Sequence, residues 1–147
     1  MRMVDISEKP VSQREAVATG KVFMQAATLQ LIQQNKIAKG DVLVASRLAG
    51  INAAKQTHQL IPLCHPLLID HVAIDFSLNN DPPSVTITGT VRGSGKTGFE
   101  MEALTAVAIA ALTIYDMCKP VDQTLHLEDI RLVKKSGGKS GTVIFKA

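Results

Sequence analysis

The sequence is poor in aromatic residues: among its 147 residues are four phenylalanines, one tyrosine and no tryptophan. Proteins that bind single strands of nucleic acid stack bases on aromatic side chains in a basic surface, and no basic stretch of this chain carries such a platform. Nucleic acid is therefore not an expected partner.

Cysteine is equally scarce. Cys64 and Cys118 lie in separate segments, so the sequence contains neither a disulfide framework nor a Cys-x-x-Cys motif. We expect two reduced thiols. Either could be a nucleophile, although a lone buried cysteine is more commonly a small packed hydrophobic side chain.

Long apolar segments are also missing. No uncharged apolar run approaches the roughly 20 residues of a membrane span, and residues 1–9 lack the apolar core of a signal peptide. We expect a cytoplasmic protein with no membrane partner, built as a single domain over residues 1–147. From Arg131 onward the chain is basic without acidic residues, which favours a small phosphorylated ligand or is simply a solvated surface.

Apolar periodicity predicts two helices in the first part of the chain. A capping box at Ser12 and Glu15 precedes apolar residues at helical spacing, which predicts a helix over residues 13–34. Asp41 is the expected N-cap of a second helix that reaches about residue 59. Gly50 either weakens this second helix or marks close packing.

Alternating apolar residues predict antiparallel strands over residues 71–78 and 85–91, preceded by a rigid proline-containing loop over 61–66. A further strand over 125–132 changes its alternation near Asp129, as at a bulge, and a short last strand covers 142–145. The expected order is helix, helix, strand, strand, helix, strand, strand. This order predicts an α+β domain with helices on one face of an antiparallel sheet.

The third predicted helix, over residues 98–119, has no charge between residues 103 and 112 and should be buried nearly all round. Its charged residues gather at the two ends. Glu102 and Asp116 are separated by ~21 Å along the axis, so one copy cannot bring them together. Two antiparallel copies could, because small residues permit a close approach at positions Ala103, Ala106, Ala108, Ala110 and Ala111. An alanine-rich helix packed on its own sheet explains the composition equally well.

Two glycine-rich stretches resemble a phosphate-binding P-loop but lack its first glycine. The motif needs glycine five residues before its Gly-Lys pair, where this chain has Thr90 in one case and Val133 in the other. A weaker expectation follows for Lys96, which enters a helix N-terminus whose free N–H groups suit an anion. Glu100 and Glu102 in the first turns could merely complement the same helix dipole.

His65 could be a metal ligand, a general acid or base, or a structural histidine in a rigid loop. No other histidine or cysteine stands at ligand spacing from it, so metal binding is the least favoured role. Asp116 and Lys119 face the same way on the helix and could form a surface ion pair. Alternatively, several lysines converge on phosphate oxygens: Lys39, Lys55, Lys96, Lys119, Lys135 and Lys139.

Ordered blocks along almost the whole chain resemble one known family, the cyclic pyranopterin monophosphate synthases of molybdenum cofactor biosynthesis (the protein C family). The blocks are residues 3–7, 39–42, 53–55, 60–66, 95–104, 115–119 and 135–141. The resemblance implies a ferredoxin-like fold and a homohexamer, a trimer of dimers, with the active site at the dimer interface. It also implies a lyase that converts 3′,8-cyclo-7,8-dihydroguanosine triphosphate to cyclic pyranopterin monophosphate and releases diphosphate.

The resemblance further implies roles for individual residues. Asp116, Lys119, Lys39 and His65 match catalytic positions, and the matched substrate-binding positions are Leu63, Cys64, His65, Glu100, Met101, Glu102, Lys55 and Lys135. Asp116, Lys119 and His65 could transfer protons if burial moved their pKa values toward neutrality. No cofactor is firmly expected, and Mg²⁺ could accompany the triphosphate. The roles of Lys96, Lys134 and Lys139 stay open, as do two other functions, a phosphoryl-ligand-binding module without catalysis and an RNA-binding module.

Overall fold

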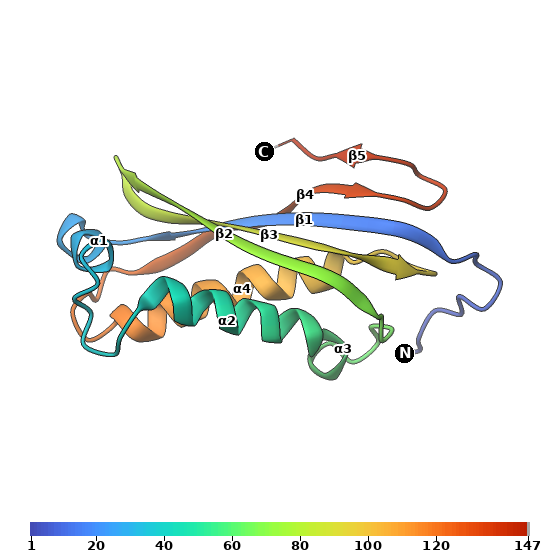
Figure 1. Ribbon diagram of the computed structural model, residues 1–147, viewed down its shortest axis with the longest axis horizontal. Coiled ribbons are helices and arrows are strands. Elements are labelled where there is room, and N and C mark those ends of the chain that lie inside the picture. The colour runs from blue at the N-terminus through green and yellow to red at the C-terminus, as the bar shows by residue number, and fades with distance from the viewer. Residues whose placement is uncertain (147) are drawn as a thin grey trace.

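The structure is a computed structural model that describes residues 1–146. A five-stranded antiparallel sheet in the order β2-β3-β1-β4-β5 is covered on one face by helices, with α2 and α4 side by side (Figure 1). The elements are β1 (Ser12–Phe23), α1 (Ala26–Gln33), α2 (Val42–Lys55), α3 (Thr57–Leu60), β2 (Ile69–Asn80), β3 (Pro83–Gly95), α4 (Glu100–Cys118), β4 (His126–Ser136) and β5 (Val143–Ile144). The β1-α2-β2-β3-α4-β4 order and the strand order are those of a ferredoxin-like fold, which confirms the predicted α+β class.

The predicted helix over residues 13–34 is wrong. Residues 12–23 form β1, the central strand, which pairs with both β3 and β4, and only residues 26–33 are helical. Ala18, Val22 and Ala26 stand four residues apart, and a spacing of four fits both one face of a helix and one face of a strand. The chain therefore begins its fold with a strand, and the predicted order of elements is wrong at that point.

The remaining predicted elements are confirmed within a few residues. Asp41 caps α2 by accepting a hydrogen bond from the Val44 backbone N–H at 3.1 Å. A side chain at Gly50 would lie 3.0 Å from the Ala106 carbonyl oxygen of α4, so this glycine marks close packing. The predicted bulge is present in β4, where Asp129 has a φ of 61° and the pairing with β1 shifts register.

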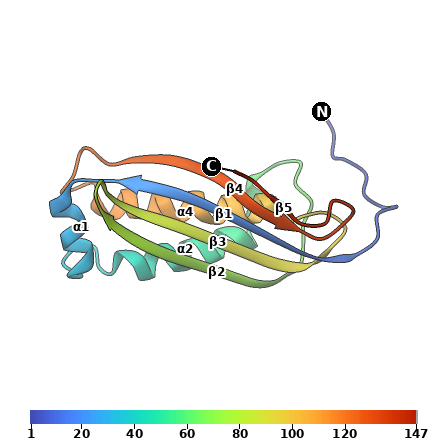
Figure 2. The same cartoon turned by 90° about the horizontal axis from the view of Figure 1, so that it is seen from above.

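Helix α4 lies under the middle of the sheet, against β1, β3 and β4, whereas α2 lies under the β2 edge (Figure 2). Val107 packs against Gly20 and Gly89, at which an added Cβ would approach its methyl groups to 2.9 Å. The expected burial all round is wrong for the outer face, where Leu112 is exposed. By length and composition α4 could cross a membrane, but more than half of it is buried in this domain, as in many core helices.

The alanines of α4 serve this packing. Ala103, Ala106, Ala110 and Ala111 are fully buried within the chain itself, and only Ala108 is partly exposed. These four buried side chains are therefore not available for the close approach of a second copy of the helix. The alternative interpretation, an alanine-rich helix on its own sheet, is confirmed.

Candidate functional site

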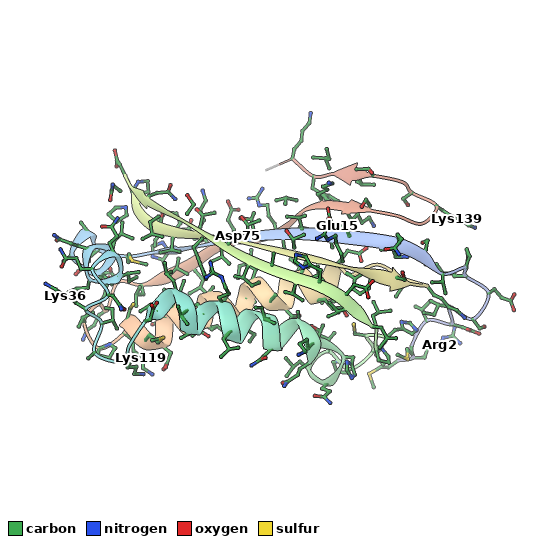
Figure 3. All side chains as sticks on the ribbon, viewed as in Figure 1. Arg2, Glu15, Lys36, Asp75, Lys119 and Lys139 are labelled. Carbon is green, nitrogen blue, oxygen red and sulfur yellow. The ribbon has the colours of Figure 1, made fainter. Side chains whose placement is uncertain are left out.

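The residues predicted to act together fall into two groups at opposite ends of α4. The helix runs without interruption from Glu100 to Cys118, so Glu102 and Asp116 are separated by ~21 Å along its axis. In Figure 3, Lys119, which follows α4, and Lys139, which lines a pocket together with Glu100, lie toward opposite ends of the molecule. One chain does not bring the two groups together.

The lysine–aspartate cluster, formed by Lys39, Asp116 and Lys119, lies at the carboxyl end of α4. The Asp116 Oδ2 atom is 2.9 Å from the Lys39 Nζ atom, and its Oδ1 atom is 2.9 Å from the Lys119 Nζ atom. Lys39 also donates a hydrogen bond to the backbone carbonyl of Asp116 at 3.1 Å. The loop between α1 and α2 positions Lys39 beside a residue that lies far away in the sequence.

This cluster is open to solvent, with 57% of the Asp116 side chain exposed. Hydrogen bonds from Lys119 and Lys39, together with their positive charges, hold the pKa of Asp116 below its usual value. The expected move of this pKa toward neutrality is therefore absent from the single chain, because the required burial is absent. In the chain alone, the cluster presents an ionised carboxylate between two ammonium groups.

The glutamate cluster, formed by Cys64, His65, Glu100, Glu102 and Lys135, lies at the amino end of α4. Glu102 is only 3% exposed. Its Oε2 atom is 3.9 Å from the Cys64 Sγ atom, and its Oε1 atom has no hydrogen-bond partner among residues 1–146. Glu102 is thus a buried carboxyl with unused hydrogen-bonding capacity beside a site that the resemblance assigns to the substrate.

Burial controls the acidity of this cluster. It raises the pKa of Glu102, and the negative charge of Glu100 raises it further. Burial, and to a smaller extent the negative charge of Glu102, also raises the pKa of the Cys64 thiol. This thiol is therefore not activated as a nucleophile. Cys118 is buried as well, and burial raises the pKa of its thiol to about 11. Burial thus disfavours the thiolate form of both cysteines in this chain.

The remaining residues of this end come from the loop after α3 and from the ends of α2 and α4. Residues 61–66 form neither helix nor strand, as predicted, because Pro62 and Pro66 disfavour helix at the residues before them. The His65 Nε2 atom is 2.7 Å from the Val4 carbonyl oxygen. Leu63 and Met101 expose their side chains to solvent. Lys55 is exposed at the end of α2 and forms no ion pair within the part of the chain that the structure describes.

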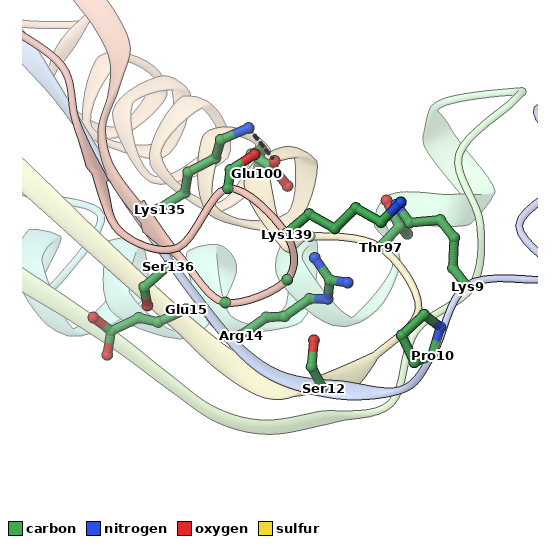
Figure 4. Close-up of a pocket in the computed structure, with 14 residues that line it drawn as sticks. Lys9, Pro10, Ser12, Arg14, Glu15, Thr97, Glu100, Lys135, Ser136 and Lys139 are labelled. Carbon is green, nitrogen blue, oxygen red and sulfur yellow. Dashed lines mark hydrogen bonds and ion pairs between the residues drawn. The ribbon is translucent and has the colours of Figure 1, made fainter.

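A pocket of about 640 Å³ opens beside Glu100 and the glycine-rich turn that follows β4 (Figure 4). Four of its lining residues are cationic, namely Lys9, Arg14, Lys135 and Lys139. Lys135 is 3.4 Å from Glu100, whereas its neighbour Lys134 is 3.4 Å from Glu15, so the two lysines of the doublet have different partners. Such a concentration of positive charge suits a phosphorylated ligand.

Sequence reasoning missed Arg14. Its Nε atom donates a hydrogen bond to the Gly95 carbonyl at 2.9 Å, which ties β1 to the loop that enters α4. The Arg14 guanidinium also occupies the place where a side chain at Gly138 would extend. The pairing of Ser12 with Gly95 puts Arg14 on this pocket, so it could have been found only by treating residues 12–23 as a strand.

No group of three or more histidine, cysteine, aspartate or glutamate side chains within residues 1–146 is arranged to hold a metal ion. The chemistry that the chain itself offers is proton transfer by carboxyl, ammonium and imidazole groups, and binding of anions by lysine and arginine.

Fold and site together define a ferredoxin-like α+β protein that collects lysines and acidic residues around the two ends of its central helix. The chain belongs to the MoaC family, whose profile matches residues 3–138. It is 56% identical over 140 residues to the cyclic pyranopterin monophosphate synthase of Chloroflexus aurantiacus, covering 95% of this chain and 86% of that protein. Proteins of the same name are similar to it in Roseiflexus castenholzii (54% identity, 97% and 90% covered) and Desulfitobacterium hafniense (56%, 97% and 87%).

Proposed function

We propose that this chain is a cyclic pyranopterin monophosphate synthase. It converts 3′,8-cyclo-7,8-dihydroguanosine triphosphate to cyclic pyranopterin monophosphate and releases diphosphate, an early step of molybdenum cofactor biosynthesis. The observation that carries this conclusion is membership of the MoaC family over nearly the whole chain, at 54–56% identity to enzymes of that name. We expect the enzyme to act in the cytoplasm.

The glutamate cluster is proposed to bind the substrate. Glu102 offers a buried carboxyl with a free oxygen, which can take a hydrogen bond from, or give one to, a purine-derived ring. Leu63 and Met101 present apolar surface beside it, and Cys64 packs against the carboxyl. Glu100 and Lys55 are assigned to the same pocket by the family resemblance.

The phosphates are proposed to bind where the cations gather. Lys135 lies beside Glu100 and lines the same pocket as Arg14, Lys9 and Lys139. Lysine and arginine donors around a triphosphate stabilise the negative charge that develops on the departing diphosphate. We expect Mg²⁺, where the reaction uses it, to enter with the triphosphate oxygens.

The lysine–aspartate cluster is proposed to transfer protons during ring opening and ring closure. The Asp116 carboxylate is the group proposed to accept a proton, and its two lysine neighbours, each at 2.9 Å, are proposed to donate one. His65 at the other end of the helix is proposed as a second acid or base. Because both ends are needed around one substrate, we propose that a second copy supplies the missing end and that the chain forms a homohexamer built from three such dimers.

The direct test is to incubate the purified protein with the cyclised nucleotide and to measure diphosphate and the pterin product. We expect turnover by the natural chain and at least a hundredfold loss in Asp116→Ala and Lys119→Ala, because each removes a group of the reaction. Saturable nucleotide binding without product would instead identify a phosphoryl-ligand-binding module. Affinity for RNA that falls steeply with salt would identify an RNA-binding protein.

A further inference from the structure

The hydrogen bond between His65 and Val4 determines which nitrogen of the imidazole ring carries hydrogen. The Nε2 atom lies 2.7 Å from the Val4 carbonyl oxygen. A carbonyl oxygen can only accept, so Nε2 must be the donor. In the neutral ring the lone pair then resides on Nδ1, which makes no hydrogen bond within residues 1–146.

The residues that follow Val4 form a local turn. The Asp5 Oδ1 atom accepts hydrogen bonds from the Ser7 backbone N–H at 2.9 Å and from the Ser7 hydroxyl at 2.7 Å. These bonds fold the chain back on itself, as in an Asx-turn. The conformation of residues 5–7, directly after the Val4 carbonyl, is therefore stabilised by the segment's own hydrogen bonds.

The same segment has a second attachment at the amino end of α4. The Lys96 Nζ atom donates a hydrogen bond to the Ser7 carbonyl at 3.4 Å. Farther along, Lys9 and Pro10 line the cationic pocket. Residues 4–10, called here the N-terminal strap, therefore contact His65 of the glutamate cluster and Lys96 of the loop before α4, and form part of one pocket wall.

We propose that Val4 is a positioning residue, whose backbone carbonyl holds His65 with hydrogen on Nε2 so that Nδ1 faces the reaction as the proton-exchanging atom. The proposal rests on the proposed function, because it deepens the role given there to His65. In the step, Nδ1 accepts a proton from the substrate and the ring becomes an imidazolium. The Nε2–H bond to Val4 persists throughout, and the charge on the ring strengthens it. The proton returns from Nδ1 later in the cycle, which restores the neutral ring.

The strap can be shortened in a matched pair of proteins. Deletion of Met1 and Arg2 starts the chain at its own Met3 and keeps the Val4 carbonyl. Deletion of residues 1–5 with Ile6→Met removes that carbonyl and leaves the pocket residues Lys9 and Pro10 in the chain. We expect the first protein to retain full activity and the second to lose about tenfold in kcat, the low end of the cost of removing the partner that orients a functional histidine. KM should change by less than kcat, since the substrate-binding residues are intact.

A spectroscopic measurement tests the tautomer without reference to activity. Isotope-labelled histidine and a long-range proton–nitrogen correlation spectrum distinguish the two neutral tautomers, and His65→Gln identifies the His65 signals. We expect hydrogen on Nε2 in the full chain and a mixture of tautomers in the chain that begins at position 6.

The outcomes separate this inference from the proposed function. Hydrogen on Nδ1 in the full chain, or an unchanged kcat in the chain lacking Val4, would overturn the role of Val4 even in an active enzyme. Absence of turnover by the full chain would instead overturn the proposed function. If the shorter chain does not fold, the spectrum of the full chain still decides the tautomer.

Discussion

At the scale of single residues, the two ends of α4 hold carboxyl groups of opposite character. Glu102 is buried, and burial raises its pKa. Asp116 is exposed, and its two lysine neighbours lower its pKa. Glu102 therefore keeps its proton to a higher pH than an ordinary glutamate, whereas Asp116 gives up its proton at a lower pH than an ordinary aspartate. A carboxyl group is thus proposed to bind the substrate at one end of α4 and to transfer protons at the other.

Replacing Glu102 by glutamine tests this character. A carboxyl whose pKa is raised on folding stabilises the folded chain at low pH, and that advantage is lost as pH rises from the unfolded value of about 4.3 through the folded pKa. The stability of the natural chain relative to Glu102→Gln should therefore fall as pH rises, while turnover falls at least tenfold. Urea unfolding at several pH values measures the first effect. Glu8→Gln, at an exposed position, should show no such trend, and a parallel pH dependence in both variants would contradict the role of burial.

At the scale of elements, one aspartate connects the start of α1 to the end of α4. Gln25, the N-cap residue of α1, makes no side-chain hydrogen bond to the helix. Instead Asp122, in the connection after α4, accepts hydrogen bonds from the Gln25 backbone N–H at 2.9 Å and the Thr28 hydroxyl at 2.7 Å. It also accepts from the backbone and hydroxyl of Thr124. Asp122 therefore fastens the start of α1, and with it the segment leading to Lys39, to the carboxyl end of α4.

We predict that Asp122→Asn weakens the fold in a pH-dependent way. Burial alone would raise the pKa of Asp122, but hydrogen bonds from Thr124, Gln25 and Thr28 outweigh it and lower the pKa to about 2. Because the pKa is lower in the folded chain, ionised Asp122 stabilises the fold at pH values above the unfolded-state pKa of about 3.9. This stabilisation is lost as pH falls toward 2, and its full size is on the order of 2 kcal/mol. Asparagine keeps one acceptor oxygen, so we expect a loss of about 1–2 kcal/mol at pH 7.

Urea unfolding at pH 7, 5 and 3 checks this prediction, with the exposed Asp75→Asn as the matched control. The difference between natural chain and Asp122→Asn should shrink toward pH 3, whereas Asp75→Asn should change little at any pH. An equal loss at all three pH values would show that shape, and not the charge of Asp122, stabilises the junction.

Some elements could be predicted from local sequence patterns, whereas others could not. Helix α4 and the hairpin of β2 and β3 follow from local patterns, and the pair formed by Asp116 and Lys119 follows from helical spacing alone. Strand β1 was mistaken for a helix because Ala18, Val22 and Ala26 stand four residues apart, a spacing that fits one face of either element. Arg14 was missed for that reason. The contact of Lys39 with Asp116 joins residues 77 apart in the sequence, and local periodicity carries no information about such a pair.

At the scale of the whole molecule, the separation of the two clusters is built into the topology. Helix α4 is the longest helix of the described chain, and it runs along the sheet (Figure 1). One cluster lies at each of its ends. Its alanines are already buried against the chain's own sheet and α2, so two copies of α4 cannot approach through that face. A shared site must therefore join the amino end of one chain to the carboxyl end of another through exposed residues, such as Met101, Leu112 and Tyr115.

Mixing two inactive variants tests this sharing. Glu102→Gln disables the amino end and Asp116→Asn the carboxyl end, and each variant alone should be inactive. We assume that every site combines the amino end of one chain with the carboxyl end of another. Equal mixing and refolding then gives mixed dimers in half of the cases, and each mixed dimer has one intact site out of two. About a quarter of the natural activity should therefore return. Each variant refolded alone is the control. Light scattering should give about six times 15.7 kDa for all three preparations. Mixed assemblies without recovered activity would contradict a site that is shared between the two ends of different chains.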